Sequence, residues 1–409
     1  MAMMRKHKSD RIIGVLTVIL LGLGLIVIYA IGPMRANVMN SAYGTDLDEN
    51  YFFIHQLISV VLSLAVAFLA FVVPYSVVRK CGKFVLLAGL GMCALLMILS
   101  MVNSPLAKCE LGACRWINVS SSLSIQPAEI LKLGLVLYLA SLIVERKKEG
   151  RLESKDFWIP FVIVSVLALG FVVVIQKDLG TGVSIMAIIL AMLFMSGVKL
   201  RYFMMVLAVI LVAGVGAIMS SPHRRERLLT FGSAESSDSY HIENAMIAIG
   251  TGGFWGVGIG NSVQATGYLP ESINDSVFAV MGETFGFVGL SAIVACFAGL
   301  LFRLLRTARF LHDDEQSLIV IGIFAWLTAH VVLNISSMTG LMPLTGITLP
   351  LLSSGGTSML FSAAALGLAL QISCYTAREP RKETTVTTKT VNSETNIVRR
   401  QEARREVRL

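Results

Sequence analysis

Charged residues are scarce in this chain. Asp, Glu, Lys and Arg make up only 15% of its 409 residues, whereas 55% are hydrophobic and the mean hydropathy is +0.74. This composition excludes an ordinary soluble domain. The sequence also lacks a Walker-type phosphate loop, a nucleotide-binding fingerprint and an internal repeat, so nothing in it supports energy coupling by ATP.

Long hydrophobic runs are what the chain has instead. Ten of them have the length of a membrane-spanning helix, near residues 12–32, 52–74, 84–102, 127–144, 158–176, 181–197, 202–219, 276–302, 317–339 and 357–375. The first run follows a basic N-terminus, but it is longer than the apolar core of a signal peptide and no convincing cleavage site follows it. We interpret it as a retained anchor. The runs predict an all-α integral membrane protein with about ten transmembrane helices.

Lys and Arg are concentrated in alternate short loops, which predicts the orientation of the chain. The basic loops carry Arg79, Lys80, Lys83, Arg146, Lys147, Lys148, Arg151, Lys155, Lys199, Arg201, Arg303, Arg306 and Arg309. Because cytoplasmic loops are enriched in Lys and Arg, we expect these loops and both termini on the cytoplasmic side. The net charge of +8 is therefore a topological signal and gives no evidence for nucleic acid.

The predicted organisation has three parts. Residues 1–11 form a cytoplasmic N-terminus, and residues 12–375 form the membrane domain, with a large extracytoplasmic loop at 220–275 between spans seven and eight. Residues 376–409 form a disordered basic cytoplasmic tail, which either stays solvated, rests on anionic lipid or docks a partner. The long loop contains three arginines, Arg224, Arg225 and Arg227. Either they carry no topological signal, because long loops follow the positive-inside rule weakly, or they bind an anionic lipid headgroup or pyrophosphate.

The stretch from Asn244 to Asp275 is rich in glycine and polar residues, although it lies between apolar blocks. Such backbone cannot face lipid with unpaired amides, so we expect it to line a protein-walled or water-filled cavity. If the next helix begins near Asp275, the spacing places Asp275 and Glu283 on one face, where two carboxylates can perform acid–base chemistry or hold a cation. The alternatives are a helix N-cap for Asp275 and interhelical hydrogen bonding for Glu283. These residues alone do not decide between a transporter and an enzyme.

Ionisable residues within the predicted spans are further candidates, because unpaired charge is costly in a membrane. Glu129 and Lys132 are three residues apart and share a helix face, so they form a structural ion pair or present the Lys132 charge to a lipid-linked phosphate. Asp178 either caps the next helix or faces the same cavity. His330 and Asn334 are four apart on span nine and are expected to form a hydrogen-bonded packing pair rather than a proton relay.

Two of the six cysteines share a predicted external loop. Cys109 and Cys114 are close enough in sequence to form a short disulfide in an oxidising compartment. Metal binding there has less support, since no further Cys or His accompanies them.

An ordered set of motifs closely resembles the FtsW/RodA family, the SEDS proteins of cell shape, elongation, division and sporulation. Any one motif is weak, but together and in this order they are highly specific, and they run from about the first span to the tenth. The motifs are GACRWI at 112–117, QPAE at 126–129 followed by Lys132, QKDLGT at 176–181, AIGTGG at 248–253, GIGNSVQ at 258–264, GLMPLTGITLP at 340–350 and SSGGTS at 353–358.

The resemblance implies a ten-helix peptidoglycan glycosyltransferase that polymerises lipid II, an undecaprenyl-pyrophosphate-linked disaccharide peptide, at the outer face of the cytoplasmic membrane. It implies that Asp275, which follows Tyr-Leu-Pro-Glu at 268–271, is the catalytic carboxylate and acts as general base. Arg115 and Lys132 are expected to stabilise the pyrophosphate, with a divalent cation, Mg2+ or Mn2+, as an additional candidate for which no ligands are assigned. The other substrate-site candidates are Glu129, Asp178, Ser262, Gln264, Glu271 and Glu283.

The chain departs from the family pattern around the expected catalytic residue. The family usually has His-Thr-Asp-Phe-Ile there, whereas this chain has Ile273-Asn274-Asp275-Ser276-Val277. The aspartate is retained in altered surroundings. Other departures are Ala128, Lys177, Ala265, Gly267 and Ser354.

Within the family, Asn261-Ser262 and residues 343–350 are most similar to the division branch, FtsW, or to the sporulation branch. The resemblance therefore implies septal wall synthesis beside a class B penicillin-binding protein transpeptidase and other divisome proteins, in contact with membrane lipid. Two alternatives are a lipid II flippase, which would need alternating access, and a non-catalytic scaffold that activates the transpeptidase.

Overall fold

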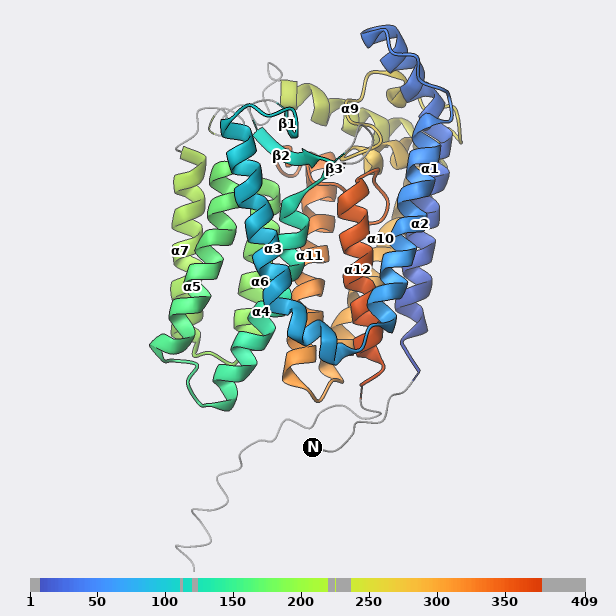
Figure 1. Cartoon of the computed structure of the whole chain (residues 1–409). Helices are drawn as coiled ribbons and strands as arrows, with labels where there is room; N and C mark the ends of the chain where they lie inside the picture. Colours follow the sequence, from blue (N-terminus) through green and yellow to red (C-terminus); the bar gives the residue numbers. More distant parts are fainter. Residues whose placement is uncertain (1–7, 111–112, 120–123, 220–224, 226–236, 377–409) are drawn as a thin grey trace, which may run out of the picture.

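The computed structural model describes residues 8–110, 113–119, 124–219, 225 and 237–376. Long helices run side by side across its whole height, with three short strands and a further helix at one end (Figure 1). The predicted tail at 377–409, the first seven residues and the arginines at 224 and 227 lie outside the described residues. Arg225 is described and exposed.

Except for α9, the helices follow the predicted apolar runs. They are α1 (Arg11–Tyr43), α2 (Tyr51–Val72), α3 (Tyr75–Met101), α4 (Pro127–Lys148), α5 (Lys155–Leu169), α6 (Leu179–Met195), α7 (Leu200–Met219), α9 (Ser237–Thr251), α10 (Val277–Arg309), α11 (Asp314–Met338) and α12 (Gly356–Ser373). A π-helical turn at Gly170–Ile175 extends α5, and a 3-10 turn, η2, spans Gln264–Thr266.

Within the described part of the chain, nine helices are long and apolar enough to cross a membrane. The helix α6 is also apolar but has only 17 residues, or about 25 Å at 1.5 Å per residue, which lies at the lower limit for a span. The chain is thus a multi-pass membrane protein in which all ten predicted runs are helical. The helix α9 lies within the predicted 220–275 loop and is not one of these spans.

The helices α4, α11 and α12 form the interior of the bundle, whereas α7 buries no residue. Small residues allow the interior helices to approach their neighbours closely. A Cβ at Gly134 of α4 would lie 2.6 Å from the Leu86 Cα of α3, and one at Gly367 of α12 would lie 2.1 Å from the Ala67 carbonyl oxygen of α2. Any larger residue at these positions would push the helices apart.

A small antiparallel sheet, which the sequence analysis did not predict, lies between α3 and α4. It contains β1 (Ala107–Glu110), β2 (Ala113–Asn118) and β3 (Ser124–Ile125), in that order. Cys109 pairs with Cys114 across β1 and β2, and their sulfur atoms form a disulfide. The Thr357 hydroxyl of α12 donates to the Ser124 carbonyl (2.9 Å), so the sheet is tied to the interior of the bundle.

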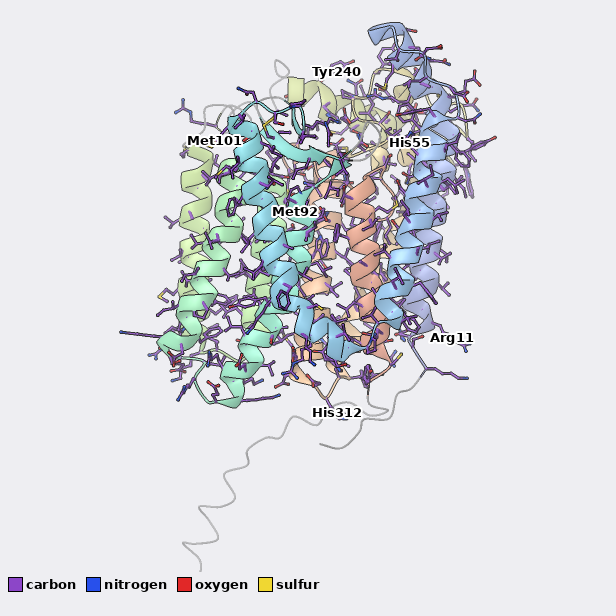
Figure 2. All side chains as sticks on the ribbon, in the orientation of Figure 1. Arg11, His55, Met92, Met101, Tyr240 and His312 are labelled. Carbon is purple, nitrogen blue, oxygen red and sulfur yellow. A yellow bond between two sulfur atoms is a disulfide. The ribbon has the colours of Figure 1, made fainter. Side chains whose placement is uncertain are left out.

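The two ends of the bundle differ in content. The sheet and α9 lie at the same end in Figure 1, and the first turn of α1 lies at the other. Figure 2 likewise places Tyr240 and Met101 toward the first end and Arg11 and His312 toward the second. The end with the sheet also carries the connection between α9 and α10, which contains Asp275.

Candidate functional site

Asp275 lies in a turn segment immediately before α10. Its backbone carbonyl accepts a hydrogen bond from the Asn334 Nδ2 of α11 (2.7 Å), and the same Nδ2 donates to the Ile347 carbonyl (2.7 Å). The Ile273 carbonyl accepts from the Ser354 amide (2.8 Å). Two segments far apart in sequence, 270–276 and 346–354, are therefore fastened together beside α11. This junction holds the Asp275 side chain 93% buried, with 7% of its surface exposed.

The structure corrects two of the sequence-based alternatives for this carboxylate. The helix α10 begins at Val277 and its N-cap residue is Ser276, so Asp275 does not cap the helix. Because Asp275 precedes the helix, it also does not share a helical stripe with Glu283. The two carboxylates are bound to different parts of the chain.

Burial and the nearby Glu271 carboxylate raise the pKa of Asp275 from 3.8 to about 7, although hydrogen bonds from its own backbone and from Ser276 oppose this rise. Glu271 has a left-handed backbone conformation (φ 48°), and its Oε2 accepts from Asn274 Nδ2 (2.5 Å). A carboxylate with a pKa near the working pH is suited to general base catalysis, since it is substantially ionised and still basic.

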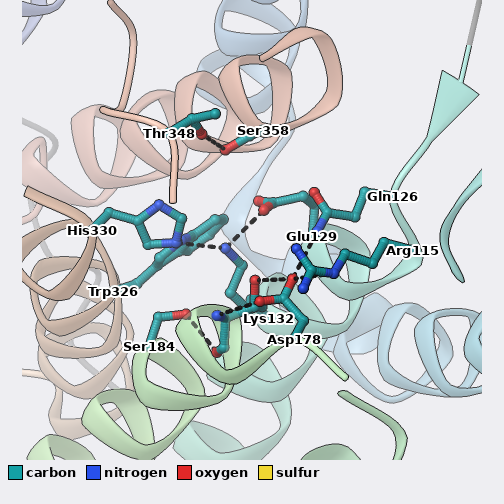
Figure 3. Close-up of polar contacts among 11 residues, drawn as sticks. Arg115, Gln126, Glu129, Lys132, Asp178, Ser184, Trp326, His330, Thr348 and Ser358 are labelled. Atoms are coloured by element: carbon teal, nitrogen blue, oxygen red, sulfur yellow. Dashed lines mark hydrogen bonds and ion pairs between the residues drawn. The ribbon is translucent and has the colours of Figure 1, made fainter. Parts of the chain in front are cut away.

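Lys132 and Glu129 form a buried ion pair on α4 (Figure 3). Lys132 Nζ lies 2.9 Å from Glu129 Oε1 and 2.9 Å from His330 Nε2, and 4.5 Å from the centre of the Trp326 ring. Trp326 Nε1 also donates to His330 Nε2 (3.2 Å). Because Nε2 faces two donors, it acts as the acceptor and the imidazole is neutral with its proton on Nδ1. The Lys132 side chain is 0% exposed, so it does not present its charge at the surface.

Arg115 and Asp178 lie beside this pair (Figure 3). Asp178 caps α6, since its Oδ1 accepts from the Thr181 amide (3.0 Å) and its Oδ2 from the Thr181 hydroxyl (2.8 Å). Gln126 Nε2 donates to Asp178 Oδ2 (3.4 Å). Arg115 Nε lies 4.0 Å from the same oxygen, and its Nη2 donates to the Lys177 carbonyl (3.1 Å). The Arg115 side chain is 33% exposed and is the cation of this group that solvent reaches.

One helix joins the two polar clusters. His330 contacts Lys132, and Asn334 contacts the Asp275 carbonyl. These residues are one turn apart on α11, or about 6 Å along its axis. The prediction that His330 and Asn334 form a hydrogen-bonded pair was wrong, since they bind different partners. Their common spacing indicated one helix face, but no sequence pattern indicates their partners on other elements. Trp326 was likewise missed.

Glu283 fastens the glycine-rich loop to α10. Its carboxylate accepts from the Ser262 hydroxyl and from the amides of Val263 (2.9 Å) and Gln264 (3.3 Å). The loop also packs into a break in α10 at Gly286, whose φ is +65° and where a Cβ would lie 2.4 Å from the Gly256 amide nitrogen. The structure thus gives Glu283, Ser262 and Gln264 bonding partners within the protein and brings them to the end of the bundle that holds Asp275.

Among the described residues, no group of three or more His, Cys, Asp or Glu side chains has the geometry to hold a metal ion. The carboxylates of the site are instead used in ion pairs, caps and loop bonds. Mg2+ needs only one or two protein carboxylates where a substrate phosphate supplies further ligands, so the divalent cation stays a prediction.

Replacing Asn334 with Leu is expected to loosen the junction around Asp275. The change leaves the carbonyls of Asp275 and Ile347 without their donor, and each unsatisfied buried group costs about 1–3 kcal/mol. We expect a lower thermal unfolding temperature, measured on the purified protein in detergent. An unchanged unfolding temperature would show that the two segments are held by other contacts. The exposed Asn261→Leu, whose Nδ2 contacts only the Val257 carbonyl, is the matched control.

Comparison with known proteins identifies relatives over almost the whole chain. The family model FTSW_RODA_SPOVE, described as "Cell cycle protein", matches residues 11–378. Stage V sporulation protein E of Bacillus subtilis is 30% identical over 375 residues, which cover 91% of this chain and 98% of the relative. The probable peptidoglycan glycosyltransferase FtsW of Coxiella burnetii is 32% identical and covers 90% of this chain and 96% of its own. That of Idiomarina loihiensis is 34% identical, with coverage of 89% and 86%.

Solved structures share the fold. One, described as "Structural coordination of polymerization and crosslinking by a peptidoglycan synthase complex", superposes with a TM-score of 0.69 at 24% identity and covers 89% of this chain and 97% of the other. The rod shape determining protein RodA of Thermus thermophilus superposes with a TM-score of 0.63 at 23% identity, covering 91% and 98%. At this identity the structures establish the architecture alone.

Proposed function

The chain belongs to the FtsW/RodA/SpoVE family, and on that premise we propose that it is a peptidoglycan glycosyltransferase of the FtsW branch, which polymerises lipid II into glycan strands for septal wall synthesis. The observation that carries the proposal is Asp275, a buried carboxylate held by two loop segments and α11 in a chain about one third identical to probable peptidoglycan glycosyltransferases. A carboxylate in this setting performs the proton transfer that glycosyl transfer requires.

The chemistry assigns a role to each group. The 4-hydroxyl of the acceptor sugar attacks the anomeric carbon of the undecaprenyl-pyrophosphate-linked donor. A carbon–oxygen bond forms at the anomeric carbon, the bond to the pyrophosphate oxygen breaks, and Asp275 takes the hydroxyl proton. Undecaprenyl pyrophosphate leaves as an anion. Arg115, partly exposed at the same end of the bundle, is suited to stabilise that anion by paired hydrogen bonds.

The buried pair of Lys132 and Glu129 acts on the site through its neighbours. Lys132 is enclosed by Glu129, His330 and Trp326 and does not contact solvent. Through His330 it is coupled to α11, which also carries Asn334 and so holds the Asp275 junction. We assign Lys132 a positioning role in this conformation, with Asp178 and Gln126 as the supports of Arg115.

We place the catalytic end on the outer face of the cytoplasmic membrane, with both termini inside and the protein at the division septum. The basic residues support this orientation, since Arg79 and Lys147 pair with Glu315 and Asp314 at the start of α11, close in sequence to His312 at the end opposite the sheet (Figure 2). An extracytoplasmic sheet is also compatible with the Cys109–Cys114 disulfide, which persists in an oxidising compartment. The partners we expect are a class B penicillin-binding protein and other divisome proteins.

Proteoliposomes separate the proposal from its two alternatives. The purified protein is reconstituted with labelled lipid II, and both glycan strands and movement of the label between leaflets are measured. We expect strands to form without net movement of lipid II. Movement of lipid II without strands would favour a flippase. Neither strands nor movement, in a preparation where a control polymerase works and a class B penicillin-binding protein is present, would favour a scaffold.

A further inference from the structure

The Ser276 hydroxyl lies at the centre of a chain of polar contacts that ends at Asp275. Its Oγ is 2.5 Å from His241 Nε2 of α9, 2.9 Å from the Pro270 carbonyl and 3.5 Å from Asp275 Oδ1. Ser276 is 0% exposed and His241 is 5% exposed. These contacts join α9 to the segment that carries the carboxylate.

The position of Ser276 makes these contacts informative. Ser276 is the N-cap residue of α10, where a serine side chain usually accepts from a helix amide, yet it makes no such bond. Its hydroxyl is used for the contacts with His241, Pro270 and Asp275 instead. The hydroxyl is therefore a part of the surroundings of Asp275 rather than a cap.

Counting protons fixes the direction of the bonds. A serine hydroxyl has one proton to donate, whereas the Pro270 carbonyl and an ionised Asp275 can only accept. If His241 Nε2 accepted the serine proton, both of those oxygens would face the lone pairs of Oγ. If Nε2 carries a proton and donates it, the serine proton is left for either oxygen. Only the second arrangement leaves the serine proton for one of these two acceptors.

We propose that His241 and Ser276 are positioning residues for Asp275. The Nε2–H of His241 holds the Ser276 hydroxyl, whose proton stabilises the ionised Asp275 carboxylate. Once Asp275 has taken the acceptor proton, the serine proton turns to the Pro270 carbonyl. No bond to carbon is formed or broken by this pair, and no proton is consumed. The inference rests on the proposed function, since it assumes that Asp275 is the base.

The charged groups around Asp275 allow this contribution to be isolated. Glu271, on the same segment, opposes ionisation of Asp275. The contact from α11 is the neutral amide of Asn334, and the contact from α9 is made through Ser276 by His241. The neighbouring turn at Gly346 presents only backbone, with a Cβ position 4.0 Å from Asp275 Oδ2. Removing the serine proton thus takes away a donor without changing the count of charges near Asp275.

The test compares the pH dependence of strand formation in wild type, Ser276→Ala, His241→Ala and His241→Gln. Loss of a hydrogen bond to the ionised carboxylate should raise the pKa of Asp275 by about one unit. In Ser276→Ala and His241→Ala the rising limb of the pH–rate profile should therefore shift to higher pH by about one unit. Near pH 6 their rates should be about tenfold lower, and on the high-pH plateau they should approach wild type. His241→Gln retains an amide donor and should recover most of the shift. Ser272→Ala removes a buried hydroxyl that makes no hydrogen bond, and it is the matched control.

A lower plateau with an unshifted limb in both Ser276→Ala and His241→Ala would overturn the inference, since it indicates a structural role only. A second measurement does not depend on activity. Nitrogen-15 NMR of labelled protein, with His241 assigned by difference from His241→Gln, should show the Nε2–H tautomer, and an Nδ1–H tautomer would also overturn the inference. If wild type forms no strands while His241 shows Nε2–H, the proposed function fails and the hydrogen-bond assignment stands.

Discussion

Asp275→Asn is expected to reduce the rate of glycan strand formation by about 100- to 10,000-fold, the range that a positioned general base contributes. Asparagine has nearly the same shape but cannot take the proton of the acceptor hydroxyl. The backbone carbonyl of residue 275 still accepts from Asn334, so the junction should remain folded. The initial rate on labelled lipid II, measured at equal amounts of monodisperse protein, provides the test.

The control for this variant is Asp46→Asn, which makes the same chemical change at an exposed position in the connection between α1 and α2. It should leave the rate unchanged. A rate within threefold of wild type for Asp275→Asn would remove Asp275 from the role of base. A loss of the folded, monodisperse peak would instead assign it to stability.

Lys132→Met is expected to lower the free energy of unfolding by about 3–5 kcal/mol, because it leaves the Glu129 carboxylate buried without its cation. Glu129 is 2% exposed and its Oε1 has Lys132 as its partner, so the variant leaves the carboxylate largely shielded from solvent and without its cation. His330 Nε2 also loses a donor. Thermal unfolding followed by the intrinsic fluorescence of tryptophan measures the effect.

Glu129→Gln combined with Lys132→Met removes both charges and should recover a large part of the stability. The contrast is Arg151→Met, which removes an exposed cation that lies 3.8 Å from the carboxylates of both Glu149 and Asp156. Exposed pairs contribute at most about 1 kcal/mol, so this variant should unfold near the wild-type temperature. Equal unfolding temperatures for Lys132→Met and Arg151→Met would contradict the buried ion pair.

The fold was accessible from the sequence because it depends on local signals. Apolar length alone located each membrane-spanning helix. The three-residue spacing of Glu129 and Lys132 predicted an ion pair as one of two alternatives, and the structure has this pair at 2.9 Å. Asp178 followed one of its two predicted alternatives, the helix cap, because a carboxylate at that position reaches the amide of Thr181 three residues later.

The site was accessible only in part, because its contacts join segments far apart in the chain. Asn334 and the Asp275 carbonyl are 59 residues apart in sequence, and Lys132 and His330 are 198 apart. No periodicity encodes such pairs. The small sheet was missed for a related reason, since its strands are short and β3 has only two residues. The helix α10 begins two residues after Asp275, so the prediction that Asp275 and Glu283 share one helix face was wrong.

The central claim is that Asp275 is the base of a glycosyl transfer, and the pH dependence of strand formation tests it most directly. A base acts when ionised, so a pKa raised to about 7 predicts that the rate increases about tenfold per pH unit well below pH 7 and becomes constant above it. The residual rate of Asp275→Asn should lack this rising limb of the pH–rate profile. The same limb near pH 7 in Asp275→Asn would contradict the assignment of Asp275 as the base, and a wild-type limb near pH 4 would contradict its raised pKa.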